Sequence, residues 1–203
     1  SPDPSCRQFR STMNEPADTA PLERDDRLRC ERFPRSNRYH PAWVLEGAGG
    51  GANALWLAEW LSEAMDLRPG MRVLDLGCGG GHITYRVAPH VASVVACDVT
   101  STMLAVVAET AAERGLTNVT TQQAAAEKLL FESGSFDIVI ARYTSHHWDD
   151  FDAGLREARR VLKPDGLAIF IDVVAPGSAL LDTHLQTLEL LRDGSHVRNY
   201  NVA

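Results

Sequence analysis

The sequence predicts an α/β fold in which helices cover both faces of an open, doubly wound parallel sheet. Two observations support this fold. Short runs of consecutive apolar residues, with the length of buried strands, alternate with longer stretches whose apolar residues recur at helical spacing. The first apolar run, residues 73–76, leads directly into a cluster of glycines. A strand that ends in a glycine-rich turn before a helix is typical of ligand-binding α/β domains.

The predicted elements follow this alternation in order. Asn53 is a suitable N-cap for a first helix, which Pro69 and Gly70 end. The five predicted strands are residues 73–76, 94–97, 119–123, 138–141 and 168–171. The later helices are residues 81–89, 101–114, 151–162 and 179–193. The inner face of the second of these is Met103, Val107 and Ala111, and the apolar stripe of the last is Leu181, Leu185, Leu188 and Leu191.

Length and composition limit the class of protein. With 203 residues, 44% of them hydrophobic and 23% charged, the chain has the size and composition of one globular domain. A formal net charge of -7 disfavours nucleic acid as a partner. The four cysteines form no C-x-x-C pair, and no His/Cys cluster has zinc-ligand spacing. We therefore expect no metal site, reduced thiols and a cytoplasmic protein. No apolar run approaches the ~18 residues of a membrane span, and no secretory signal pattern is present.

Residues 1–40 differ in composition from the rest of the chain. They are polar and interrupted by prolines, and their arginines alternate with acidic residues. Such a stretch cannot bury enough apolar surface to offset the entropy of ordering it. We expect it to be disordered or loosely attached, with residues 41–203 forming the folded domain.

The glycine-rich turn after the first strand indicates the kind of ligand. Asp75 lies just before Gly77, Gly79 and Gly81. A carboxylate there would repel a pyrophosphate and suits a cationic group, such as the amino group of a methionine moiety. His82 stands where a dinucleotide fingerprint has its last glycine, and no Gly-Lys-Ser/Thr follows. The loop therefore argues against NAD and ATP and favours a nucleoside with a positively charged tail.

Two residues after the second strand suit the nucleoside itself. Asp98 ends that strand, and its two carboxylate oxygens can accept hydrogen bonds from both hydroxyls of a ribose. Met103 follows in the next helix. It can pack on an adenine face or lie in the core, and the sequence leaves both interpretations open.

Several motifs resemble those of class I S-adenosylmethionine-dependent methyltransferases, in the same order. They are DLGCGGG, ACDVTSTML, LREARRVLKPDG and AAAEKLLFESGSFDIVIARYTSHHW, the last resembling the ubiquinone/menaquinone C-methyltransferase branch. The resemblance covers residues 71–175. It implies a Rossmann-like sheet with strand order 3-2-1-4-5 and S-adenosyl-L-methionine as cofactor.

The resemblance also implies roles for individual residues. The cofactor-binding residues would be Asp75, Gly77, Gly79, Gly81, Asp98, Met103, Ala126, Glu127 and Arg142. The first three would contact the methionine end, Asp98 the ribose and Met103 the adenine face. Ala126 and Glu127 would lie at the adenine edge, and Arg142 would border the sulfonium.

Two histidines follow the fourth strand on the ligand side and are candidate catalytic residues. Methyl transfer needs a base only where the acceptor must lose a proton, and the imidazole of His146 or His147 suits that task. The alternative is that one or both only pack against or line the site. Trp148, next along the chain, is expected to cover the site or cap the next helix.

The two ends of the chain depart from this pattern. Residues 33–72 resemble a different methyltransferase subgroup, and residues 176–200, which contain LRDGSHVRNY, resemble a poorly characterised bacterial subgroup. The resemblance implies two further C-terminal strands that this chain lacks, which predicts an exposed apolar edge at the fifth strand. We therefore expect a marginally stable chain or a homodimer formed through that edge.

The leading functional hypothesis is methyl transfer from S-adenosylmethionine to a small-molecule acceptor. The alternative is an S-adenosylmethionine-binding module that lacks catalysis because of truncation. A nicotinamide-dependent oxidoreductase is disfavoured by Asp75 and His82, and an RNA methyltransferase by the net charge of -7.

Overall fold

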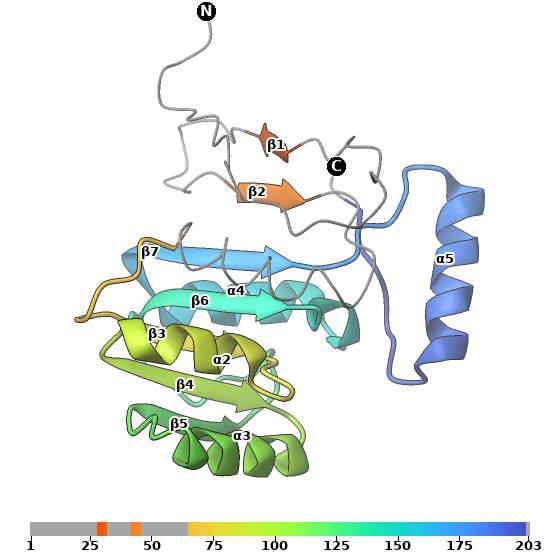
Figure 1. The fold of residues 1–203 in the computed structure, drawn as a ribbon. Helices are drawn as coiled ribbons and strands as arrows, with labels where there is room; N and C mark the ends of the chain where they lie inside the picture. The colour runs from red at the N-terminus through yellow and green to blue at the C-terminus, as the bar shows by residue number, and fades with distance from the viewer. Residues whose placement is uncertain (1–27, 32–41, 46–64, 202–203) are drawn as a thin grey trace, which may run out of the picture.

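In a computed structural model of the chain, a five-stranded parallel sheet forms the centre of the molecule (Figure 1). The structure describes residues 65–201 and the backbone of residues 28–31 and 42–45. The strands of the sheet are β3 (Arg72–Leu76), β4 (Ser93–Asp98), β5 (Val119–Gln123), β6 (Phe136–Arg142) and β7 (Leu162–Ile171). Their spatial order is β5-β4-β3-β6-β7, and each neighbouring pair is parallel. This confirms the predicted fold class and strand order.

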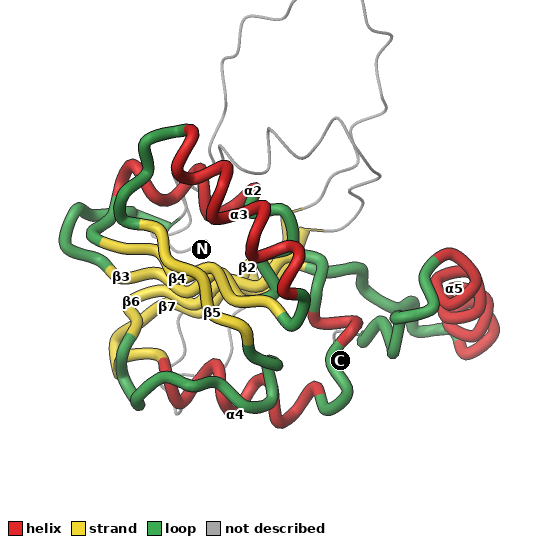
Figure 2. Tube along the Cα trace, turned by 90° about the horizontal axis from the view of Figure 1, so that it is seen from below, coloured by secondary structure: helices red, strands yellow, loops and turns green. Residues whose placement is uncertain are grey.

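Helices cover both faces of the sheet, as Figure 2 shows: α2 (His82–Val87) and α3 (Ser101–Glu113) lie on one face and α4 (Phe151–Val161) on the other. A short helix, η1 (Ala88–His90), continues α2. Consecutive side chains of a strand point to opposite faces. Val73 accordingly packs with Ile83 of α2, and Leu74 packs with Ala158 of α4. The strands are continuously apolar because both of their faces are buried.

The inner face of α3 differs by one residue from the predicted one. Leu104, Val107 and Ala111 are buried, whereas Met103 is 43% exposed. Residues that are three and seven positions apart share a helix face, and Leu104 lies at these spacings from Val107 and Ala111. The interpretation of Met103 as a core residue is therefore wrong.

The junction between α4 and β7 also differs from the prediction. The helix was expected to reach residue 162, but Leu162 opens β7 and pairs with Phe136. A register shift between Phe136 and Ile138 accommodates this early pairing. Pro164 then lies inside a strand at the edge of the five-stranded sheet, where a missing N–H is tolerated.

A second sheet pairs β1 (Leu28–Glu31) with β2 (Ala42–Leu45) in antiparallel orientation. No periodic pattern in the sequence predicts these two strands. The helix predicted after Asn53 lies outside the described residues, as does most of the N-terminal segment.

The C-terminal helix stands beside the sheet rather than on it (Figures 1 and 2). Helix α5 (Ala179–Arg192) contains no buried residue, so the predicted stripe is not buried against the described part of the chain. Leu181, Leu188 and Leu191 are 56%, 50% and 80% exposed. Residues 193–200, here called the strap, return to the sheet edge, where His196 and Asn199 are buried. Within residues 65–201 no helix has the length and apolar character needed to cross a bilayer.

Gly154 in α4 gives a test of how tightly this face of the sheet is packed. An added Cβ would lie 2.4 Å from Cε3 of Trp148, which is 6% exposed and packed against Phe170. We expect Gly154→Ala to lower the free energy of unfolding by about 1–3 kcal/mol, although alanine is the better helix former. Urea denaturation measures the change.

The matched control is Gly70→Ala. An added Cβ at Gly70 has no atom within 4 Å, and its φ is not positive. This variant should change stability by no more than about 0.5 kcal/mol. Equal stability of the two variants would contradict the packing of Trp148 described above.

Candidate functional site

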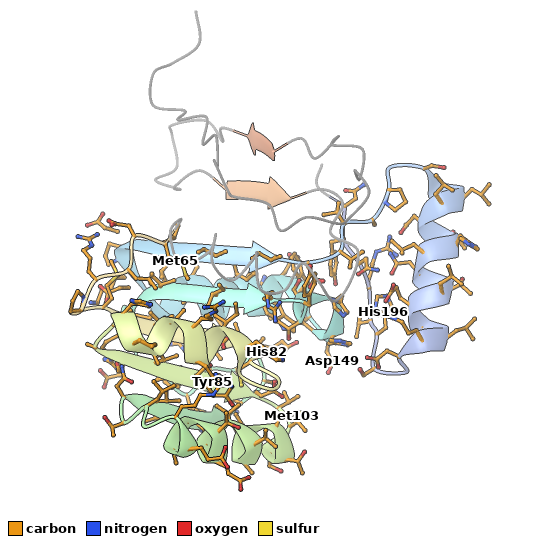
Figure 3. The ribbon with its side chains drawn as sticks, in the orientation of Figure 1. Met65, His82, Tyr85, Met103, Asp149 and His196 are labelled. Carbon is orange, nitrogen blue, oxygen red and sulfur yellow. The ribbon has the colours of Figure 1, made fainter. Side chains whose placement is uncertain are left out.

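The carboxyl ends of the five strands meet at one edge of the sheet, where open α/β sheets bind their ligands. Figure 3 shows His82, Met103 and His196 at this edge, on the side toward which the strand arrows point. They come from the start of α2, the start of α3 and the strap. The edge therefore gathers side chains from distant parts of the sequence.

The glycine loop after β3 is fixed against β4. The amides of Gly77 and Cys78 both donate to the carbonyl of Cys97, at 2.8 and 3.0 Å. At Gly77 (φ 70°) an added Cβ would lie 2.0 Å from Oγ1 of Thr144, so only glycine allows that approach. At Gly79 (φ 48°) an added Cβ would have no atom of residues 65–201 within 4 Å. The open side of the loop is therefore at Gly79.

Asp75 lies beneath this loop and is 2% exposed. Its Oδ2 accepts hydrogen bonds from the amide and the hydroxyl of Thr84, at 3.0 and 2.6 Å. Burial raises the pKa of Asp75 from 3.8 to about 6, because the bonds from Thr84 and the charge of Arg142 offset the lost hydration only in part. Both bonds use Oδ2, so Oδ1 is left for another donor.

Asp98 ties the loop to the next strand. Its Oδ2 accepts from the amide of Gly79 and its Oδ1 from the amide of Thr100, both at 2.9 Å. Each carboxylate oxygen has two lone pairs, so each can accept one further hydrogen bond. Met103, one turn further along α3, exposes its side chain at the same edge.

An imidazole–carboxylate pair lies across the edge, at the ends of β6 and β7. Nδ1 of His146, in the short helix η2 (Ser145–His147), lies 2.5 Å from Oδ1 of Asp172. Oδ2 of Asp172 accepts from the hydroxyl of Ser145 at 2.6 Å. Burial would raise the pKa of Asp172, but the hydrogen bonds from His146 and Ser145 outweigh it and lower the pKa. The ionised carboxylate places the ring proton on Nδ1 and leaves the lone pair on Nε2.

The adjacent His147 is held differently. Its Nδ1 lies 3.1 Å from the carbonyl oxygen of Ser195 in the strap, which can only accept, so Nδ1 is the donor. Its Nε2 lies 4.0 Å from Asp193. The two histidines predicted as catalytic are thus brought together, with ring centroids 4.0 Å apart, but only His146 is oriented by a partly buried carboxylate.

Residues 74–170 match the family model described as a methyltransferase domain. Residues 74–170 form a class I methyltransferase domain. The uncharacterized protein YafE of Escherichia coli is 52% identical over 124 residues, 61% of this chain and 60% of that protein. The uncharacterized methyltransferase YcgJ of Bacillus subtilis is 41% identical over 141 residues, 70% of this chain and 56% of that protein. The chain thus spans less than two thirds of the length of these relatives.

Solved structures agree with this identification. The crystal structure of the Bacillus subtilis YcgJ protein superposes with a TM-score of 0.70 at 39% identity, covering 71% of this chain and 62% of that one. A putative methyltransferase from Bacillus halodurans gives 0.69 at 33% identity, with the same coverage. The cofactor of the class I methyltransferase domain is S-adenosylmethionine.

The structure places the other predicted residues of the methyltransferase domain as follows. Gly81 (φ 78°) is the N-cap residue of α2. Ala126 is buried in the core, and Oε1 of Glu127 accepts from the amide of Asp150 at 3.3 Å. The guanidinium of Arg142 lies 5.4 Å from the ring centre of Tyr143, at the end of β6. Trp148 is buried against Phe151 and Phe170, so it is a core residue and does not cover the site.

Sequence reasoning missed Asp172, Thr84 and the strap. Asp172 follows an apolar strand directly, as Asp98 does, and that pattern could have marked it. Its pairing with His146 depends on β6 and β7 being parallel neighbours. Thr84 and the strap carry no sequence pattern that predicts their contacts.

The raised pKa of Asp75 predicts a specific pH dependence of stability. A carboxyl whose pKa is higher in the folded state stabilises the fold most at low pH, and this contribution is lost as pH rises from about 4 to about 6. Asp75→Asn should abolish it. Between about pH 4 and pH 7, the free energy of unfolding of the native chain should fall by about 3 kcal/mol relative to that of the variant. Parallel denaturation curves of the two proteins would refute this.

Proposed function

We propose that the protein transfers the methyl group of S-adenosylmethionine to a small-molecule acceptor. The observation that carries this proposal is the arrangement of two carboxylates, Asp75 and Asp98, on either side of the open Gly79. The net charge of -7 favours a small acceptor over a nucleic acid.

The residues at the edge fit this cofactor in charge and shape. The free Oδ1 of Asp75 suits the amino group of the methionine moiety, and the spare lone pairs of Asp98 suit the two ribose hydroxyls. Gly79 lets the methionine end approach the backbone, and the exposed Met103 can cover the adenine. Arg142 ends β6, and Glu127 lies in the turn that follows β5 at the same edge.

The bound cofactor supplies an activated methyl group on a sulfonium, so the protein mainly aligns the acceptor and excludes water. Where the acceptor atom carries a proton, Nε2 of His146 accepts it. The carboxylate of Asp172 then stabilises the positive ring through Nδ1. Asp172 is a positioning residue, because it acts through His146.

Calorimetric titration with S-adenosylhomocysteine tests the proposal. We expect saturable binding of one molecule per chain, with NADH giving no heat of binding as the control. A chain that is folded by circular dichroism and binds no S-adenosylhomocysteine would refute the proposed function. A methyl acceptor can then be sought by measuring release of S-adenosylhomocysteine from the cofactor over a panel of hydroxylated and amino compounds.

A further inference from the structure

The strap forms hydrogen bonds with the segment that carries the candidate catalytic residue His146. The amides of Val197 and Arg198 both donate to the carbonyl of His146, at 2.8 and 3.0 Å. On its other side, Gln186 of α5 donates to the carbonyl of Asn199 at 2.9 Å. The strap thus connects α5 to the segment that carries His146.

The hydrogen bonds of Gln186 fix the tautomer of His196. The Nε2 of Gln186 donates to Asp182 and to the carbonyl of Asn199, so its Oε1 faces the other way. That Oε1 accepts from the amide of Asn199 and lies 2.9 Å from Nε2 of His196. Two acceptors cannot pair, so Nε2 of His196 carries the proton.

Nδ1 of His196 consequently carries no proton, and its lone pair faces the protein interior. The residue is 7% exposed, and Nδ1 is buried without a hydrogen-bond partner among the described residues. Burial lowers the pKa of His196, and the nearby His146, His147 and Arg192 lower it further, against the opposing charge of Glu189. The ring is therefore neutral, and Nδ1 remains an acceptor that lacks a donor.

The position of His196 indicates which group would donate a hydrogen bond to Nδ1. The rings of His196 and His146 have centroids 5.6 Å apart, whereas Asp75 and Asp98, the two carboxylates proposed to hold the cofactor, lie at the ends of β3 and β4. We propose that Nδ1 of His196 binds a hydroxyl or N–H group of the methyl acceptor beside His146. This rests on the proposed function, and it identifies the acceptor as a compound with a hydrogen-bond donor close to the methylated atom. Because Nδ1 is shielded from solvent, the acceptor reaches it when the atoms that cover it move aside.

Two substitutions separate this binding role from a structural one. Glutamine at this position can keep the donor that reaches Gln186 but has no acceptor at the place of Nδ1. Asparagine loses the donor to Gln186 but can place its carbonyl oxygen near Nδ1. A structural role predicts that His196→Gln resembles the native protein and His196→Asn is impaired, whereas the binding role predicts the opposite order.

The test uses phenol as a minimal donor and anisole, which lacks the hydroxyl proton, as its matched control. With S-adenosylhomocysteine present and histidine labelled with ¹⁵N, phenol should shift the His196 Nδ1 resonance saturably and anisole should not. His196→Gln should weaken phenol binding by about tenfold or more, His196→Asn should weaken it less, and neither should change affinity for S-adenosylhomocysteine. If phenol and anisole act alike on a chain that binds S-adenosylhomocysteine, this inference is wrong and the proposed function stands. If S-adenosylhomocysteine does not bind, the proposed function itself fails.

Discussion

Gly79→Ala should raise the dissociation constant for S-adenosylhomocysteine by about 100-fold or more while leaving the chain folded. The substitution places a methyl group on the open side of the glycine loop, where the structure has no atom within 4 Å of the new Cβ. In the free protein the methyl group therefore clashes with no atom of the described residues. In the complex it would occupy the space through which the methionine end of the cofactor approaches the backbone. Loss of the contact between the methionine end and the loop would weaken binding by roughly 3 kcal/mol. Calorimetry at several temperatures measures the affinity.

A matched control removes the contribution of backbone strain. Gly115, at the end of α3, also has a positive φ (67°) and open space around its Cβ position, but it lies away from the sheet edge where ligands bind. Gly115→Ala and Gly79→Ala should lose similar stability, of order 1 kcal/mol. Only Gly79→Ala should lose affinity. Equal affinity of the two variants would show that the cofactor does not approach Gly79.

The second large effect concerns the imidazole–carboxylate pair. With an acceptor that must lose a proton, His146→Gln should lower the rate of methyl transfer by about 10²–10⁴-fold, which is the usual contribution of a general base. The affinity for S-adenosylhomocysteine should not change, since His146 is not among the residues proposed to bind the cofactor.

Asp172→Asn tests the orientation of that base without removing it. Two donors, the hydroxyl of Ser145 and the amide of His146, face Oδ2, whereas Oδ1 has one backbone donor, the amide of Val173, so the amide oxygen of the asparagine should stay on the Oδ2 side. Its NH₂ then faces Nδ1 of His146, and the ring proton moves to Nε2, which can no longer act as a base. We expect a loss of rate close to that of His146→Gln. His90→Gln, an exposed histidine near the opposite end of the sheet, is the control. Full activity of Asp172→Asn would contradict the assigned tautomer.

The proposed cofactor half of the site is largely predictable from the sequence because its residues are close together along the chain. Asp75, Gly77 and Gly79 lie within one strand–loop segment, and Asp98 ends the next strand. Residue type and spacing there specify both the local conformation and the chemistry. The burial of Ala126 could not be predicted in this way, because it depends on packing against Leu129 and the sheet and not on the local sequence.

The acceptor half is not predictable in this way because its residues are distant in the sequence. His146 and Asp172 are 26 residues apart. They meet because β6 and β7 are parallel neighbours whose register pairs Arg142 with Ile171, so the residues that follow both strands emerge at one edge. Sequence reasoning treated His146 and His147 alike, and the contacts of Asp172 and Ser195 distinguish them.

The sequence by itself determined the fold class, the strands of the main sheet, the glycine loop and the two carboxylates proposed to bind the cofactor. These follow from apolar periodicity and from glycines needed at fixed positions, which are properties of short segments. The tertiary structure decided which face of α3 is buried, where β7 begins, the place of the strap and the tautomers of His146, His147 and His196. The reason is physical: each of these depends on which distant atoms supply a hydrogen bond or fill a volume, and only the packed chain brings those atoms together.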